Sequence, residues 1–184
     1  MSADAIPRFH FQPTPTSPIQ AEVRLLTLVD RIEAGHLTAC DELYRLTRDE
    51  AARALFHVLG QRTDFEAMLR EVYLHLFSRL AGISVPARFS PLLYASCYAV
   101  TRKYLRWWRR PATGAQGEVV HQALRKLGHR KRIIFVYHEL CALDVDDIAE
   151  VIRQPKATVR VELQRARFEF ARAIKRLTHL EVGS

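Results

Sequence analysis

The stretch from Leu143 to Phe170 limits the possible folds of this chain more than any other. Apolar residues recur at helical spacing from Val145 to Ile152, and a second helical stripe runs from Val159 to Phe170. Arg153-Gln154-Pro155 separates the two, and proline, with its fixed φ and missing N–H, suits the first turn of a new helix. Two helices joined by so tight a break outline a helix-turn-helix, whose second helix lies in the DNA major groove. The same spacing also fits an ordinary helical hairpin with a solvated basic face.

The rest of the sequence favours an all-α fold. The chain has 184 residues, of which 48% are hydrophobic, so it can bury a core in one domain or two small ones. It contains only 7 glycines. Alternation of apolar and polar residues, the pattern of a half-buried strand, is hard to find. We therefore expect helices throughout the folded part.

The charge of the chain indicates an anionic partner. Its net charge is +8 and its pI about 9.8, which favours nucleic acid before membrane. No apolar stretch approaches the length of a membrane span, and the N-terminus lacks the cationic start and apolar run of a secretory signal. The three cysteines, Cys40, Cys97 and Cys141, are odd in number and far apart. We expect them to be reduced, in a cytoplasmic protein without membrane insertion.

No pattern in the sequence is typical of an active site. We find no paired carboxylates in a plausible site, no activated nucleophile, no phosphate-binding glycine loop and no metal-ligand spacing among the eight histidines. We therefore expect a protein that is not an enzyme and needs no cofactor or metal.

Breaks in the helical pattern divide the chain into segments. Residues 1–19 hold four prolines and predict a disordered tail. Residues 20–110 contain four helical segments, interrupted by glycines and by a loop at 81–91. Residues 111–118 have the composition of a linker. Residues 119–178 form a second unit, which contains the helix-turn-helix.

Two of the N-terminal helical segments carry further signals. From Phe65 to Leu80 apolar residues repeat every three or four positions, which predicts a buried face, with Arg70, Glu71 and Leu74 off that face. The segment at 92–109 ends in mixed cations and aromatic rings, which suits DNA phosphates and unstacked bases. Trp107 or Trp108 could equally pin this helix to the core.

The order of these features resembles the extracytoplasmic-function sigma factors, a small two-domain group of the sigma-70 family. Four stretches carry the resemblance: LVDRIEAGHLTACDELYRL, DFEAMLREVYLHLF, LLYASCYAVTRKYLR and LRKLGHRKRIIFVYHELCALDVDDIAEVIRQPKATVRVELQRAR. The last is the most specific, because it matches the family pattern without a gap. It keeps Ile148-Ala149-Glu150, Thr158-Val159 and Arg165-Ala166-Arg167.

The resemblance implies a four-helix region-2 domain over residues 20–110, a short linker, and a region-4 helix-turn-helix domain over residues 119–178. It implies a factor that binds core RNA polymerase, through the beta-prime clamp helices and the beta flap. The factor would direct initiation at promoters by recognising their −10 and −35 elements. The family also implies an anti-sigma factor as a partner.

The same resemblance assigns candidate site residues. Those expected to read the −35 element are Lys156, Thr158, Arg160, Gln164 and Arg165. Those expected at DNA phosphates are Arg130, Arg132 and Arg167. Those expected at the −10 element are Arg88, Phe89, Tyr94, Tyr98 and Arg102. Those expected at core polymerase are Asp64, Arg70, Glu71 and Leu74.

The chain departs from the family pattern in the −10 helix and the linker. Ala99 stands where the family usually has Asn, and Lys103 where it usually has Asp. The eight-residue linker reaches about 28 Å when extended, against about 34 Å for one turn of B-DNA. These departures leave an alternative: a sigma-derived helix-turn-helix regulator that binds DNA without supporting initiation.

Overall fold

Every regular element in the computed structural model, which describes residues 18–60, 62–80, 89–107 and 119–181, is helical. The predicted all-α fold is therefore confirmed. In chain order the elements are α1 (Pro18–Glu33), α2 (Leu37–Leu59), α3 (Phe65–Phe77), α4 (Phe89–Trp107), α5 (Val119–Lys126), α6 (His129–Phe135), the π-helical segment η2 (Val136–Leu140), α7 (Val145–Ile152) and α8 (Lys156–Glu181). The predicted linker, and the predicted tail up to residue 17, lie outside the described residues.

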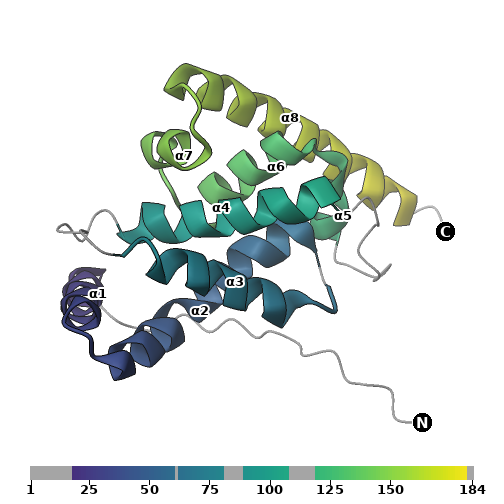
Figure 1. The fold of residues 1–184 in the computed structure, drawn as a ribbon. Helices are drawn as coiled ribbons and strands as arrows, with labels where there is room; N and C mark the ends of the chain where they lie inside the picture. The colour runs from purple at the N-terminus through teal and green to yellow at the C-terminus, as the bar shows by residue number, and fades with distance from the viewer. Residues whose placement is uncertain (1–17, 61, 81–88, 108–118, 182–184) are drawn as a thin grey trace, which may run out of the picture.

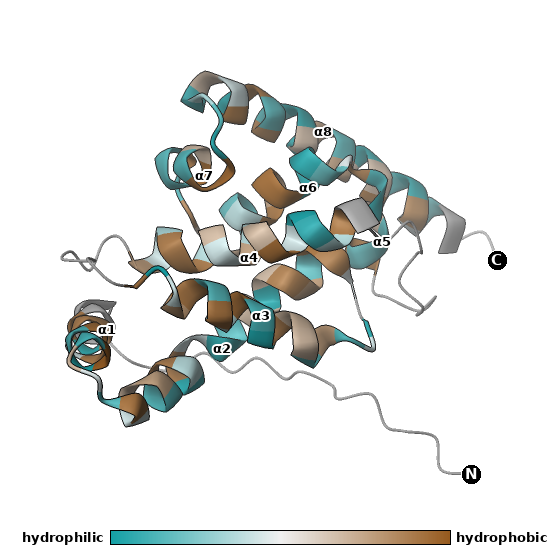
Figure 2. Cartoon of the chain, in the orientation of Figure 1, coloured by the Kyte–Doolittle hydropathy of each residue, from teal (hydrophilic) through white to brown (hydrophobic). Residues whose placement is uncertain are grey.

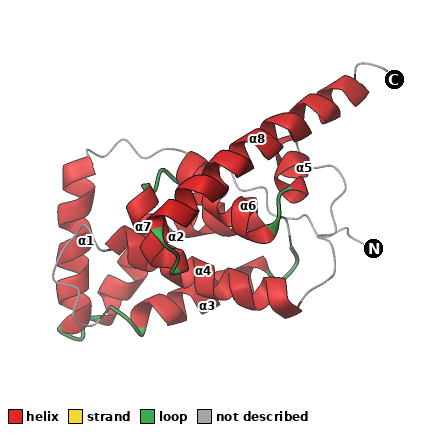
Figure 3. Cartoon of the chain, turned by 90° about the horizontal axis from the view of Figure 1, so that it is seen from above, coloured by secondary structure: helices red, strands yellow, loops and turns green. Residues whose placement is uncertain are grey.

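Helix α4 lies in the middle of the molecule, with helices packed on both sides of it (Figure 1). On one side α2 and α3 pack against α4, and α1 packs on α2. We call α1 to α4 the N-terminal half. On the other side lies the C-terminal half, α5 to α8, in which α8 packs on α5, α6 and α7. Helix α8 runs along the outside of this half, and its C-terminal end projects beyond the other helices (Figure 3).

The regular apolar stripe predicted after Asp64 is the buried face of α3. Its buried side chains are Phe65, Met68, Leu69, Val72, Tyr73 and Leu76. The residues expected off this face behave as expected: Arg70 and Leu74 are exposed, and Glu71 is half-buried. Helical spacing alone thus indicated which side of α3 points inward.

The start of α4 differs from the one that the sequence predicts. Residues 89–91 are predicted in a loop, but α4 begins at Phe89 and includes Pro91 in its first turn. Proline is tolerated there because the first N–H groups of a helix have no partner within the helix. The capping position of α2 is His36, which makes no side-chain capping bond.

The helix-turn-helix prediction is confirmed at both helices. Helix α7 spans Val145–Ile152, and α8 begins at Lys156, directly after Pro155. Arg153 closes α7 in the left-handed conformation, with φ of 54°. At the other end of α7, the Asp144 carboxylate accepts a hydrogen bond of 2.7 Å from the Asp147 N–H. This cap satisfies one of the donors left open at a helix start.

One continuous hydrophobic core joins the two halves. It runs from Leu28 and Leu43 in the N-terminal half to Ile148 and Leu163 in the C-terminal half. Figure 2 shows hydrophobic and hydrophilic residues interleaved along the helices, as amphipathic helices require. The halves therefore pack as one body in this structure, with α4 between them.

Candidate nucleic-acid interface

Helix α8 turns one side to the core and the opposite side to solvent. Its buried stripe consists of Val159, Leu163, Ala166 and Ala173. Of the residues expected to read the −35 element, Arg160, Gln164 and Arg165 are exposed on the outer side, and Lys156 is exposed at the first turn. Thr158 is half-buried. The structure thus brings this predicted set together along the first three turns of one helix.

Two apolar side chains on the same outer side were missing from that set. Val161 is 50% exposed and Phe168 is 70% exposed. Together with Gln164 and Arg165 they follow helical spacing, which places them on one stripe. An exposed apolar group beside cations suits contact with the methyl group of thymine. The spacing of Val161 and Phe168 in the sequence places them on the same face as Gln164 and Arg165. Because both are apolar, they would ordinarily be assigned to the core.

The turn of the motif is held by an ion pair between its two helices. The Nζ of Lys156 lies 2.6 Å from Oδ2 of Asp146, and both side chains are exposed. The pair connects the first turn of α8 to the first turn of α7. Lys156 therefore has an internal partner, which DNA would have to replace if this side chain reached a base or a phosphate.

The three arginines expected at phosphates lie in different environments. Arg130 is exposed on α6. Arg167 pairs with Glu139 of η2, at 2.6 Å. Arg132 is half-buried and donates hydrogen bonds to the backbone carbonyls of Val58, Arg125 and Leu127. Burial, with the nearby charge of Arg125, lowers the pKa of Arg132. Arg132 therefore has a structural role, because its hydrogen bonds link the two halves. Of the three arginines, Arg130 is the one that is exposed and not already bonded to a carbonyl or a carboxylate.

The residues expected at the −10 element lie on or before α4. Arg88 falls outside the described residues. Phe89 is buried, and Tyr94 is only 1% exposed. Tyr98 is half-buried, whereas Arg102 is exposed and lies over the Tyr98 ring, 5.6 Å from its centroid. In this arrangement two of the described candidates face the interior, so they cannot meet DNA unless the helices around them move.

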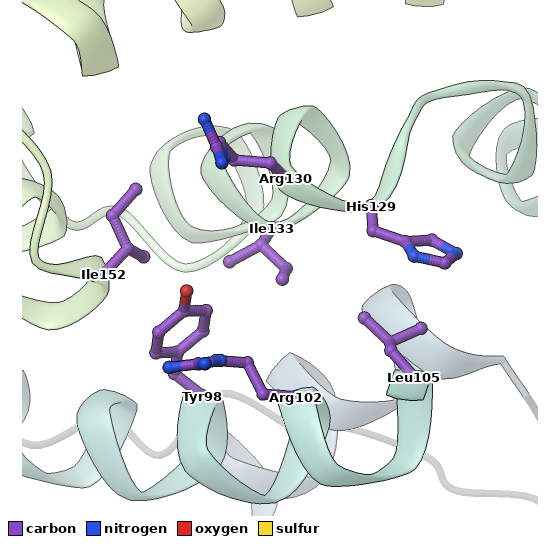
Figure 4. Close-up of a pocket in the computed structure, with 7 residues that line it drawn as sticks. All are labelled: Tyr98, Arg102, Leu105, His129, Arg130, Ile133 and Ile152. Atoms are coloured by element: carbon purple, nitrogen blue, oxygen red, sulfur yellow. The ribbon is translucent and has the colours of Figure 1, made fainter. Parts of the chain in front are cut away.

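A pocket of about 280 Å³ separates part of α4 from the C-terminal half. It is lined by Tyr98, Arg102, Leu105, His129, Arg130, Ile133 and Ile152. Figure 4 shows Tyr98 and Arg102 on α4, with Ile133 and Ile152 across the pocket from them. Its lining thus combines an apolar floor with exposed cations from both halves.

The residues expected at core polymerase gather around α3. A groove of about 300 Å³ between α2 and α3 is lined by Cys40, Asp41, Tyr44, Glu66, Arg70, Tyr73, Leu74 and Phe77. Leu74 is 66% exposed beside it. Glu71 pairs with Lys103 of α4, and Asp64 pairs with Arg62 at 2.9 Å. Arg70 and Leu74 therefore line an open groove, while the two carboxylates already have partners within the chain.

Two other kinds of site are absent from the described part of the chain. There, no helix is both long and apolar enough to cross a bilayer. Nor does that part hold a group of three or more His, Cys, Asp or Glu side chains placed to bind a metal ion.

Known proteins match this chain in two respects, the region that contains the helix-turn-helix and the overall fold. Residues 117–167 match the family Sigma-70, region 4. A solved structure described as CnrH in complex with the cytosolic domain of CnrY has the same fold, with a TM-score of 0.68 and 18% identity. The alignment covers 84% of this chain and 97% of that one. No curated protein matches the chain in sequence. The predicted resemblance is thus confirmed for region 4, over residues 117–167, and the chain as a whole shares the fold of CnrH.

Proposed function

We propose that this protein is an RNA polymerase sigma factor, which binds core polymerase and directs initiation at promoters with −10 and −35 elements. One observation carries the proposal. The region-4 match coincides with a capped helix-turn-helix whose second helix exposes Arg160, Gln164 and Arg165 on one side. The family is one of transcription factors without catalysis of their own.

The side chains on α8 suit the reading of a duplex. Arginine makes two parallel hydrogen bonds to the edge of guanine, and glutamine does the same with adenine. Arg160 and Gln164 are one turn apart, so they would reach successive bases of the −35 element. Val161, between them, would contact a thymine methyl. Arg130 would hold a phosphate, since its charge is exposed on α6.

The groove between α2 and α3 suits the docking of core polymerase. Exposed Leu74 supplies an apolar anchor, and Arg70 beside it supplies a charge. Interfaces commonly centre on such an apolar residue with a polar rim. We assign this groove to the clamp helices, with the Glu71–Lys103 pair at its edge.

A protein inhibitor is the second partner that we propose. The solved structure with the same fold contains CnrH bound to the cytosolic domain of CnrY. That fold is shared over 84% of this chain. An anti-sigma factor of comparable kind would hold this chain away from core polymerase.

In vitro transcription with core polymerase on a promoter library tests the proposal. The expected result is run-off product from a subset of promoters that share a −35 sequence, and its loss with Arg160→Ala. Arg45→Gln, which removes one charge from an exposed position on α2, serves as the matched control. DNA binding without any run-off product would instead support the alternative, a sigma-derived regulator. The burial of Tyr94 is the observation that favours this alternative.

A further inference from the structure

The pocket between α4 and the C-terminal half has an apolar floor and a cationic rim. On the floor Ile133 and Ile152 are only 4% and 5% exposed, and Leu105 lies beside them. The rim consists of Tyr98 and Arg102 of α4 and of His129 and Arg130 of α6. None of the described side chains that line the pocket is acidic. This composition favours a ligand with an apolar body and a negative charge.

The two arginines of the rim have no carboxylate partner in the described part of the chain. Arg102 lies over the Tyr98 ring, 5.6 Å from its centroid, and neither Arg102 nor Arg130 forms an ion pair there. By contrast, Arg24 and Arg167 each pair with a glutamate, at 2.7 Å and 2.6 Å. A guanidinium group can hold a carboxylate or a phosphate through two parallel hydrogen bonds. The donors of both rim arginines are therefore available to an anion.

The polar groups of the rim come from two sides of the pocket. Arg102 belongs to α4, and Arg130 belongs to α6 across from it (Figure 4). Figure 4 also shows the Tyr98 hydroxyl pointing from α4 toward the side on which Ile133 and Ile152 lie. This hydroxyl can donate or accept a hydrogen bond. A ligand on the apolar floor would thus lie between two cations and beside a hydrogen-bonding group.

The volume of the pocket, about 280 Å³, suits a small ligand, because ligand pockets commonly measure about 300–1,000 Å³. A rigid, flat ring suits the floor, since it loses little conformational freedom on binding. We propose that the pocket binds a small aromatic anion, a ring that bears one phosphate or carboxylate group. The ring lies on the floor, and Arg102 and Arg130 hold the anion. This binding needs neither DNA nor polymerase, so it is measured independently of the proposed function.

Isothermal titration calorimetry of the full chain with four probes tests the ligand class. Adenosine 5′-monophosphate and 1-naphthoate each carry a ring and an anionic group, adenosine carries the ring alone, and inorganic phosphate carries the anion alone. At least one of the two aromatic anions should bind about tenfold more tightly than adenosine and phosphate. Binding of the nucleotide alone would identify phosphorylated nucleosides as the ligands, and binding of 1-naphthoate alone would identify aromatic carboxylates.

Substitutions at two exposed rim residues test the position of the site. Arg102→Gln removes one charge and should weaken the aromatic anion about tenfold, the effect of losing a hydrogen bond to a charged group. His129→Glu adds a negative charge to the rim and should weaken the same ligand by a similar factor. Arg45→Gln and His36→Glu make the same two changes at exposed positions outside the pocket and should leave the affinity unchanged. Circular dichroism establishes that each variant is folded.

Three results would overturn the proposal. In the first, neither aromatic anion binds with a dissociation constant below about 1 mM. In the second, inorganic phosphate binds as tightly as the aromatic anions, which would show that the cations attract any anion and that the floor contributes nothing. In the third, Arg102→Gln and His129→Glu bind the aromatic anion as tightly as the wild type, which would place the ligand elsewhere on the chain.

Discussion

Lys103 on α4 and Glu71 on α3 form an ion pair of 2.7 Å across the surface of the N-terminal half. Lys103 occupies the position where the family usually has an acid, so the charge there is reversed. The hydrogen bond with Glu71 raises the pKa of Lys103. The reversed charge thus meets a carboxylate on the neighbouring helix. This pair also changes what a substitution at Glu71 would do.

Glu71→Lys should weaken the capture of core polymerase. The substitution places two like charges together on α3 and α4, next to the docking groove that Arg70 and Leu74 line. We expect the yield in a pull-down with core polymerase to fall several-fold. Lys103→Gln is the matched control, since it removes the pair but keeps the carboxylate. Capture at the wild-type level by Glu71→Lys would remove this edge of α3 from the interface.

Arg160→Ala should relax promoter choice at one base pair. Loss of a bidentate contact to a base costs about 1–3 kcal/mol, confined to one position of the site. Binding measured across a series of −35 duplexes with single base substitutions checks this. Arg172→Ala, on the same helix and also exposed, should weaken all duplexes alike. An unchanged preference at every position of the series would show that Arg160 does not read a base.

Binding of promoter duplex should fall steeply as salt is raised, because phosphate contacts release counterions. Removal of Arg130 should reduce the slope by about 1, the value for one phosphate contact. Arg167→Gln should reduce it less, since Glu139 already pairs with Arg167 in the unbound chain. Titrations of both variants and the wild type test this order. A slope near zero for the wild type would argue against a phosphate-binding surface altogether.

The free energy of unfolding should fall in acid because of a histidine pair between α2 and α5. His57 and His121 stack at 5.4 Å between centroids. Burial, with the charges of His121 and Arg53, lowers the pKa of His57 from 6.5 to about 4. The unfolded chain therefore binds the proton more readily. This contribution is present above pH 6.5 and lost as the pH falls toward 4.

Urea unfolding from pH 7 to pH 4 measures this loss, which we expect to be on the order of 1–3 kcal/mol. His57→Gln should remove much of the pH dependence, because glutamine does not titrate. His36→Gln, an exposed histidine between α1 and α2, should leave it unchanged. A His57→Gln profile parallel to the wild type would assign the acid sensitivity to other groups.

The sequence predicted individual helices well and their mutual packing poorly. The spacing around Pro155 located α7 and α8, because a proline and a left-handed Arg153 leave few alternatives for so short a break. The stripe on α3 located its buried face for a similar local reason. Whether Tyr94 faces DNA or Tyr137 depends on a contact between residues 43 positions apart, which no local pattern reports.

At the candidate site, too, the sequence predicted positions along one helix well and contacts between helices poorly. Residues on α8 were correctly placed on its outer side, since position along one helix determines which face a side chain occupies. Arg132 resembled the cations around it in the sequence, yet three backbone carbonyls hold it. Val161 and Phe168 were omitted because of their chemistry and not their spacing. Both are exposed, but they are apolar, and apolar residues are usually assigned to a core.

Helix α8 has 26 residues and is therefore about 39 Å long. Its first turns carry the residues that we propose to read the −35 element, and its later turns pack on α5 and α6. A rotation of about 10° about the far end would move the reading end by about 7 Å, roughly two base-pair steps. If α8 reads the −35 element as we propose, the position of its far end, which carries none of the proposed reading residues, would determine how the protein lies along the promoter.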